Sequence, residues 1–305
     1  MAKYALCIGI SDYSNWRSGK DSPSDLAFGV TSAEQFRDLL IDAFGFPEAN
    51  IRMMRNAWAS KGNILQGFKD LVDAAQPGDV VCIFFSGHGG LIPGVAPGGQ
   101  PEPDRYYETI LPHSGAMITD FEFEALSTRL PPSFVNLTIV LDSCHSAGMS
   151  PIEGAPCPRG SLSTSPNGFS ACRSLMRAGL CLAGRSGIAC VPGDMAKLTL
   201  AVPDNFIEQA RATLITACRT DQSSWDAPSL KGSVFMTAMT DIVRQSGLQI
   251  SNTAFVAELA ARAQILMASA INSIPRYASE RSEPQLYGQR NRMAEHVLAG
   301  FVDSR

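Results

Sequence analysis

Short apolar runs alternate with amphipathic segments along the first half of this chain. Four runs have the length and apolar content of buried strands, at 4–10, 51–54, 80–85 and 135–141. Between these runs apolar residues recur with helical spacing, which predicts helices over 31–44, 60–75 and 120–130. Strands that alternate with helices favour an α/β fold, with a mostly parallel central sheet and helices on both of its faces.

The same pattern returns after a long interruption. Residues 150–204 are rich in Gly, Pro and Ser and show little periodicity, which predicts a flexible insertion loop. The elements predicted after this loop are a strand over 212–218, helices over 232–245 and 252–274, and a final segment over 284–302 that packs back on the sheet.

Several predicted helices begin with capping signals. Thr31 and Glu34 have capping-box spacing at the start of the first helix, and Thr119 and Glu122 have it at the third. Ser60 is a good N-cap for the second helix. These signals place the helix starts near positions 31, 60 and 120.

Charge and composition exclude several classes of protein. The net charge of −4 and the pI near 5.6 argue against a protein that binds nucleic acid or anionic membranes. The apolar stretch at the N-terminus is too short for a signal peptide, and no run approaches the roughly 18 apolar residues of a membrane span. We therefore expect a cytoplasmic protein.

The 8 cysteines are consistent with that expectation. Without a secretory signal, reduced thiols are favoured over a disulfide framework. Cys172, Cys181 and Cys190 recur every nine residues, but neither a histidine nor a close cysteine pair accompanies them. Metal ligation by these three thiols is therefore disfavoured.

Two predicted strands run directly into unusual polar segments. The strand ending at Phe85 continues into Ser86-Gly87-His88-Gly89-Gly90, and the strand ending at Leu141 continues into Asp142-Ser143-Cys144-His145-Ser146. In an open parallel sheet, ligands bind beyond the carboxyl ends of the strands. If these two strands are neighbours, His88 and Cys144 face each other across that crevice.

A cysteine and a histidine placed in this way suit nucleophilic catalysis. The imidazole lowers the pKa of the thiol and later protonates the leaving amine. The neighbouring glycines let the backbone approach a substrate closely. Cys82 is a poorer nucleophile candidate because it lies inside an apolar run. Adjacent residues at a strand end point apart, so His145 is expected to be a poor base for Cys144, and His113, in a Pro-flanked turn, is a weaker alternative base.

These residues resemble the metacaspase branch of the caspase-like peptidases, particularly its prokaryotic members. A histidine roughly 50 residues before the cysteine is typical of caspases, and here the separation is 56 positions. The resemblance covers nearly the whole chain except 150–204. Further segments that resemble the family are Tyr4-Ala5-Leu6-Cys7-Ile8-Gly9-Ile10, Arg105-Tyr106-Tyr107-Glu108-Thr109-Ile110-Leu111-Pro112, Thr216-Ala217-Cys218, Asp221-Gln222-Ser223-Ser224 and Pro284-Gln285-Leu286-Tyr287-Gly288.

The resemblance implies a caspase-haemoglobinase fold and hydrolysis of peptide bonds in protein substrates. Carried over, Cys144 is the nucleophile, His88 is the general acid/base, and the backbone N–H groups of Gly89 and Cys144 form the oxyanion hole. It also implies a single caspase-like domain over 1–305, in which 1–149 is the large-subunit-like half and 205–305 the small-subunit-like half. Metacaspases are generally monomeric, so we expect a monomer.

The resemblance also implies cleavage after Arg or Lys, through an acidic pocket. Asp142 and Ser86 match family pocket positions, and a carboxylate suits a guanidinium through bidentate hydrogen bonds, which favours Arg over Lys. The structural alternative for Asp142 is a strand-end cap. The chain departs from the family at Ser32, where a second pocket aspartate is usual, and Asp221 compensates if its loop reaches the pocket.

Calcium binding is the weakest of the implied properties. Asp120 matches one position of the family's acidic cluster and Asp104 matches another, but Phe121 and Pro151 replace acidic residues. Because calcium prefers six to eight oxygen ligands, we expect weak calcium dependence or none, and no required cofactor.

Two rival hypotheses remain beside the protease. One is a catalytically silent relative that serves as a binding or regulatory module, against which the intact His88–Cys144 pair argues. The other is a cysteine peptidase with non-basic specificity, which the missing acid at Ser32 keeps open. The basic residues of the 150–204 loop are natural self-cleavage sites for an Arg/Lys-directed protease, although a solvated insertion explains them equally well.

Overall fold

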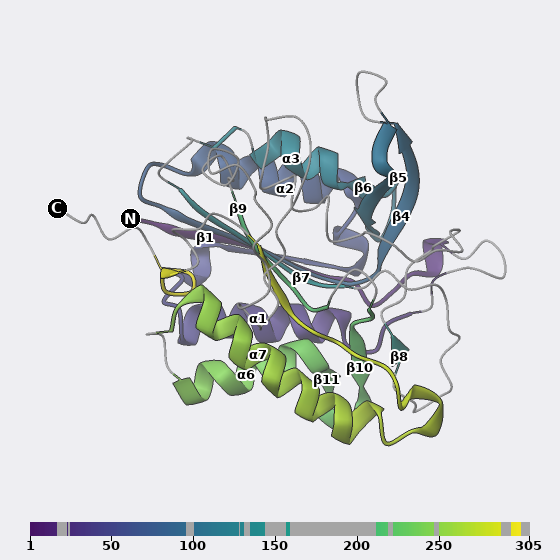
Figure 1. Ribbon diagram of the computed structural model, residues 1–305. Helices are drawn as coiled ribbons and strands as arrows, with labels where there is room; N and C mark the ends of the chain where they lie inside the picture. The colour runs from purple at the N-terminus through teal and green to yellow at the C-terminus, as the bar shows by residue number, and fades with distance from the viewer. Residues whose placement is uncertain are drawn as a thin grey trace.

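A central sheet with helices on both faces forms the body of the protein (Figure 1). The computed structural model describes residues 1–16, 23, 25–95, 101–127, 129–130, 135–143, 157–158, 212–218, 222–246, 250–287 and 294–299. Helices α2 and α3 lie on one face of the sheet, and α1, α6 and α7 lie on the other (Figure 1). The predicted α/β class is therefore confirmed.

The main sheet has 6 strands in the order β12-β9-β7-β3-β1-β2. All neighbours pair in parallel except β12, which runs antiparallel to β9. Each predicted apolar run became one of these strands. Their bounds are Lys3–Gly9 (β1), Ile51–Arg55 (β2), Val80–Ser86 (β3), Asn136–Asp142 (β7), Ala212–Thr216 (β9) and Gln285–Tyr287 (β12).

Alternate residues of the central strands face opposite helical layers. Cys82 and Phe84 of β3 belong to the core under α1, α6 and α7, whereas Ile83 and Phe85 belong to the core under α2 and α3. The α-helices span Gly29–Asp42 (α1), Lys61–Ala74 (α2), Asp120–Ser127 (α3), Val234–Ser246 (α6) and Asn252–Leu266 (α7). Single turns of other helix types span Ser14–Trp16, Glu48–Asn50, Asn56–Trp58, Pro228–Leu230, Met267–Ile271 and Pro275–Tyr277.

The capping predictions had mixed outcomes. Ser60 caps α2 as predicted, since its hydroxyl accepts the Asn63 N–H at 3.3 Å. The prediction for Thr31 was wrong, because α1 begins two residues earlier, at Gly29, without a side-chain cap. Gly29 packs so closely on the end of β1 that a Cβ there would lie 2.1 Å from the Ile10 carbonyl oxygen. Tertiary packing, rather than a capping box, therefore sets this helix start.

Two small sheets were not predicted. Strands β4 (Gly89–Val95) and β5 (Pro101–Ile110) form an antiparallel pair that continues to β6 (Ile118–Thr119). The other sheet joins β8 (Cys157–Pro158), β10 (Trp225–Ala227) and β11 (Gly232–Ser233). The predicted loop over 150–204 lies outside the described residues except for β8, so the proposed division of the domain stays a prediction.

One helical stretch has the length and apolar content of a membrane span, although no such stretch was expected from the sequence. Asn252–Ile271 is long and apolar enough to cross a membrane by length and composition alone. One side of this stretch lies in the protein core, where Phe255, Leu259 and Ala263 are buried. Its apolar character is therefore explained by packing against the sheet and α6.

The segment after β1 is fixed against the segments after β2 and β5 by polar side chains. Asn56 accepts the Ser11 and Asp12 N–H groups at 2.8 and 3.1 Å through its side-chain oxygen. The Trp16 indole N–H donates to the Pro112 carbonyl at 2.7 Å. Asp12 lies 3.3 Å from the Nε2 atom of His113. Hydrogen bonds from Ser14, with a smaller effect of His113, lower the pKa of Asp12 to about 2.

This lowered pKa makes a testable contribution to stability. The ionised Asp12 is favoured in the folded protein, so its stabilisation is fully present above the unfolded-state pKa of about 3.9 and is lost as the pH falls towards 2. We expect Asp12→Asn to lower the free energy of unfolding at pH 5, and the difference from wild type to shrink as the pH falls to 3. Urea denaturation at several pH values measures this, and a pH-independent difference would contradict it.

Candidate active site

The two predicted chemical segments leave the sheet side by side. Strands β3 and β7 are direct neighbours, and Ser86, the last residue of β3, pairs with Asp142, the last residue of β7. Beyond this pair the Gly87 N–H donates to the Asp142 carbonyl at 3.4 Å. The condition set by the sequence is therefore met: the strands that precede His88 and Cys144 are adjacent and end at the same level. His88 lies two residues beyond Ser86, and Cys144 comes two residues after Asp142 in the sequence.

His88 is held in a buried position at this edge. The residue is 2% exposed. Its backbone N–H donates to the Tyr13 hydroxyl at 2.7 Å, and its carbonyl accepts the Leu111 N–H at 2.9 Å. The Tyr13 ring meets the imidazole edge-on, with the centroids 4.5 Å apart. The backbone and the ring of this histidine are thus both fixed by neighbours from distant parts of the chain.

Gly89, the predicted oxyanion donor, begins strand β4. It pairs with Ile110 of β5, and the bond from Leu111 to His88 makes this a non-hydrogen-bonded pair of the ladder. In such a pair the N–H groups point away from the partner strand. Strand β4 is an edge strand among the described residues, so the Gly89 N–H points off the sheet. This direction is compatible with an oxyanion donor.

Asp142 is a buried carboxylate with two hydroxyl donors. It is 0% exposed, and it accepts the Ser224 hydroxyl at 2.8 Å and the Ser233 hydroxyl at 2.7 Å, one on each oxygen. Ser233 also accepts the Met236 N–H at 2.9 Å in the first turn of α6. The segment just before β10 and the end of β11, which leads into α6, therefore converge on this carboxylate.

A second buried carboxylate lies close to the first. Asp226 is 1% exposed and pairs across strands β10 and β11 with Ser233. One of its oxygens lies 3.3 Å from the Phe28 nitrogen, which donates to it immediately before α1. Ser32, one turn into the helix, is fully buried and donates its N–H to the Phe28 carbonyl at 2.8 Å. Asp226 therefore lies at the helix start that carries Ser32.

Other predicted residues lie outside the described part. Cys144, His145 and Asp221 belong to segments that are not described, so the His88–Cys144 pairing and the role of Asp221 stay predictions. Ser143, which precedes Cys144, is buried, and its carbonyl lies 3.7 Å from the sulfur of Cys218. Cys82 is a core residue, as predicted, and burial raises its thiol pKa well above the ordinary value.

His113 has a structural setting. Its Nδ1 atom lies 3.1 Å from the Asn15 amide nitrogen, and its Nε2 atom lies 3.3 Å from the Asp12 carboxylate. For an amide N–H to donate to Nδ1, the neutral ring must carry its proton on Nε2, where the carboxylate accepts it. The ring thus joins two loops, and His88 remains the stronger candidate base.

Metal binding gains no support from the described residues. Within them, no group of three or more His, Cys, Asp or Glu side chains is arranged to hold a metal ion. The side chains of Asp104 and Asp120 lie outside the described part, so the calcium prediction is not decided.

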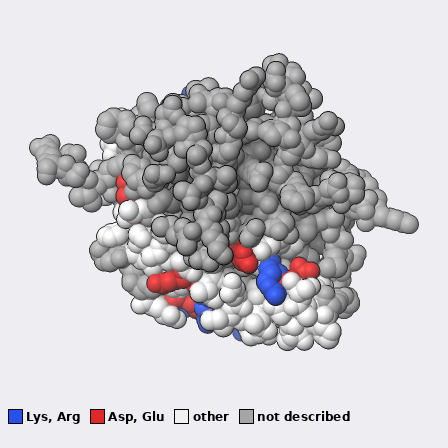
Figure 2. Space-filling model, viewed as in Figure 1, with Lys and Arg blue, Asp and Glu red and all other residues white. Residues whose placement is uncertain are grey.

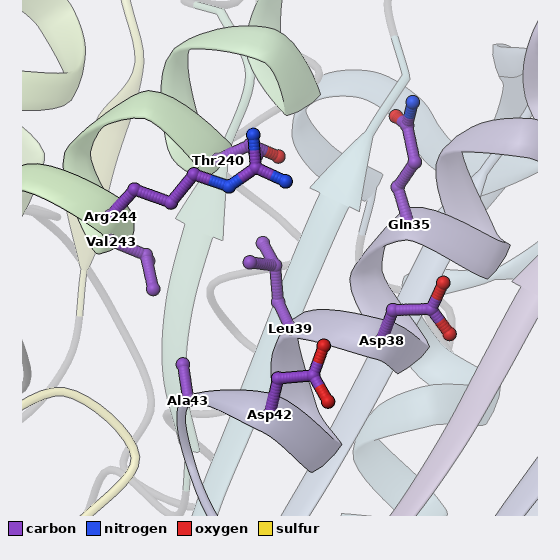
Figure 3. A pocket seen from close by; sticks show the side chains of 8 residues that line it. All are labelled: Gln35, Asp38, Leu39, Asp42, Ala43, Thr240, Val243 and Arg244. Atoms are coloured by element: carbon purple, nitrogen blue, oxygen red, sulfur yellow. The ribbon is translucent and has the colours of Figure 1, made fainter.

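A separate pocket lies between α1 and α6 (Figure 3). It has a volume of about 350 Å³, with Asp38 and Asp42 on one side and Arg244 on the other. The second half of α1 lines this pocket and ends near Lys3, at the start of β1. His88 follows the end of the parallel strand β3, so the pocket and His88 lie towards opposite ends of the sheet.

On the described surface in Figure 2, acidic and basic side chains are intermingled, and no continuous patch of one sign stands out.

Four residues of this site were missed by sequence reasoning: Tyr13, Ser224, Ser233 and Asp226. Tyr13 contacts His88 across 75 positions, and Ser233 contacts Asp142 across 91. The signal for Tyr13 was its place a few residues after a buried strand, at the edge where the chemistry was expected. Asp226 and Ser233 lie in the two strands of a short hairpin, β10 and β11, which are too brief to give a periodic pattern.

The chain resembles proteins of known family. The Caspase domain profile matches residues 2–287. Metacaspase-6 of Arabidopsis thaliana is 36% identical over 154 residues, covering 49% of this chain and 39% of that protein. Metacaspase-1 of Cryptococcus neoformans var. neoformans serotype D is 28% identical over 277 residues, covering 82% of this chain and 58% of that protein. The chain thus spans less than two thirds of the length of these relatives.

Solved structures support the same fold. A protein from Geobacter sulfurreducens superposes with a TM-score of 0.63 at 17% identity, covering 99% of this chain and 100% of that one. Caspase-1 from Spodoptera frugiperda gives a TM-score of 0.50 at 10% identity, covering 94% of this chain and 86% of that one. With a family profile that spans nearly all of the described fold and with metacaspases among its relatives, this chain belongs to the caspase-domain family.

Proposed function

We propose that this protein is a cysteine endopeptidase that cleaves proteins after Arg or Lys, with Cys144 as nucleophile and His88 as general acid/base. The observation that carries the proposal is the in-register pairing of Ser86 with Asp142. Because these two residues are paired, the segments that contain His88 and Cys144 both begin at the same place on the carboxyl edge of a parallel sheet. This edge is where α/β proteins bind their ligands. Membership of the caspase-domain family, which implies a cysteine peptidase, supports the same assignment.

The proposed reaction uses each group in turn. The Cys144 thiolate attacks the scissile carbonyl carbon and forms a C–S bond, and the carbonyl oxygen becomes an oxyanion. The outward N–H of Gly89 stabilises that oxyanion, an effect typically worth about 3–4 kcal/mol. His88 then gives a proton to the leaving amine as the C–N bond breaks. His88 then deprotonates a water, which attacks the thioester carbon. The C–S bond breaks, the carboxylic acid product leaves, and the Cys144 thiolate and the His88 imidazolium are restored.

Basic specificity rests on the buried carboxylates. The Asp142 oxygens accept the Ser224 and Ser233 hydroxyls, and a carboxylate oxygen can accept more than one hydrogen bond. A guanidinium supplies two parallel donors to such a group. Asp226 lies at the start of α1, where the family's usual second aspartate is replaced by Ser32. We assign to Asp226, rather than to Asp221, the second negative charge of the pocket.

The decisive experiment uses fluorogenic peptides that differ only at the residue before the cut. We expect turnover after Arg and Lys, Arg being faster, and none after Asp or Leu, whereas Cys144→Ala and His88→Ala show no turnover with any peptide. A folded wild type that cleaves none of the peptides would support the silent module. Cleavage only after Asp or Leu would support the non-basic peptidase.

Asp142→Asn tests the pocket separately from the chemistry. Loss of one partner of a buried charged pair costs about 2–5 kcal/mol, so kcat/KM for the Arg peptide should fall about 30-fold or more. Alkylation of Cys144 by iodoacetamide should continue, because the thiol is not changed. Asp73→Asn, which alters an exposed carboxylate on α2, is the matched control and should behave as wild type. Unaltered Arg preference in Asp142→Asn would disprove this pocket.

Self-processing follows from the same specificity. After prolonged incubation we expect wild type to yield fragments cut within the 150–204 loop, after one or more of Arg159, Arg173, Arg177, Arg185 and Lys197. Cys144→Ala should stay intact, and added calcium should change the fragment pattern little. Intact mass spectrometry with and without calcium reads out both points. A single intact mass for both proteins would refute self-processing.

A further inference from the structure

The β4–β5 ladder is interrupted at His88. Gly89 pairs with Ile110, so the next pair in register joins His88 with Leu111. A hydrogen-bonded pair of an antiparallel ladder exchanges two N–H···O bonds. One of the two is present, from the Leu111 N–H to the His88 carbonyl at 2.9 Å. The His88 N–H instead donates to the Tyr13 hydroxyl at 2.7 Å.

The Tyr13 hydroxyl thus occupies the place of a ladder bond. Its oxygen lies between the two strands, 2.7 Å from the His88 nitrogen and 3.5 Å from the Leu111 carbonyl oxygen. The hydroxyl fits there because residue 87 is glycine: a Cβ on Gly87 would lie 2.4 Å from it. The buried His88 N–H is therefore paired with this hydroxyl, and it does not form the ladder hydrogen bond to the Leu111 carbonyl of the partner strand.

The same side chain also packs against the imidazole. The two rings meet edge-on with centroids 4.5 Å apart and an interplanar angle of 62°. Tyr13 is fully buried, so this contact is not loosened by solvent. The histidine is therefore fixed at its backbone and at its ring by one residue.

Tyr13 itself is held from both ends of its segment. Its N–H donates to the Asp25 carboxylate at 2.9 Å, and its carbonyl accepts the Trp16 N–H at 2.9 Å. Asn56 accepts the two preceding N–H groups, and the Trp16 indole is bonded to the Pro112 carbonyl. Because these anchors surround Tyr13, the hydroxyl is presented to His88 at a fixed position.

We propose that Tyr13 is a positioning residue for the proposed acid/base His88: its hydroxyl ends the β4–β5 ladder and its ring orients the imidazole. The inference rests on the proposed function. Without the hydroxyl, the His88 N–H can bond directly to the Leu111 carbonyl, which draws His88 into the ladder and turns its imidazole away from the crevice. The hydrolysis step then slows, whereas the carboxylate pocket for the substrate is unchanged.

The test compares Tyr13→Phe with Tyr277→Phe in the full chain. Tyr277 is a matched control, 2% exposed and packed edge-on against Trp225. Activity is measured on an Arg peptide and divided by the amount of Cys144 that iodoacetamide labels, quantified in its own peptide by mass spectrometry. Circular dichroism first shows that each variant is folded, because unfolded molecules expose all 8 cysteines to the reagent. We expect kcat per titrated thiol to fall about tenfold in Tyr13→Phe, with KM within about twofold and Tyr277→Phe equal to wild type.

The pH profile of alkylation provides a second measurement that needs no substrate. A nearby imidazolium stabilises the thiolate, so a displaced His88 should move the acidic limb of the alkylation rate about half a unit or more to higher pH. Gly87→Ala places a Cβ against the Tyr13 hydroxyl without removing it. This variant should show the same fall in kcat and the same shift of the alkylation profile, and it replaces Tyr13→Phe if that variant does not fold.

Wild-type kcat per thiol together with an unshifted pH profile, in either variant, would overturn the proposal. If wild type cleaves no peptide, the proposed function fails, and the alkylation profile still decides whether Tyr13 positions His88. The two hypotheses are therefore separable in one set of proteins.

Discussion

The parallel pairing of β3 with β7 is the interaction on which the rest of the site depends. All residues of both strands are buried, and seven consecutive pairs run from Val80 with Asn136 to Ser86 with Asp142. A slip of one residue would move Asp142 away from the Ser224 and Ser233 hydroxyls that it accepts. The cost of leaving a buried carboxylate without these donors favours the observed register. The fixed register in turn decides which backbone positions meet at the carboxyl edge.

The main sheet was predictable because its information is local. Continuous apolar runs identify strands buried on both faces, and helices between them imply parallel pairing. The adjacency of the His88 and Cys144 strands was stated as a condition and is confirmed at the level of the strands. The predicted start of α1 was wrong by two residues, because the close contact of Gly29 with Ile10 outweighs the Thr31 capping signal.

The rest of the site could not be read from the sequence because its contacts are long-range and its elements are short. The β4–β5 hairpin begins at Gly89-Gly90 and contains Pro93, residues that are rare inside strands, so no periodic signal marks it. The hydroxyls on Asp142 come from Ser224 and Ser233, 82 and 91 positions away. Periodicity reports which face a residue occupies, whereas these bonds depend on how the chain returns to the sheet edge.

The buried carboxylates at this sheet edge are unfavourable for stability, which is consistent with the recognition role proposed for them. Burying a carboxylate carries a desolvation penalty, and well-packed apolar residues in place of buried charges are often neutral or stabilising. Yet Asp142 is fully buried, Asp226 is nearly so, and Ser32, Ser86, Ser224 and Ser233 are buried around the same sheet edge. Such a shell of small hydroxyls lowers the penalty without supplying positive charge. Under the proposed function an incoming guanidinium would complement these carboxylates, so part of the cost of burying them would be offset when the substrate binds.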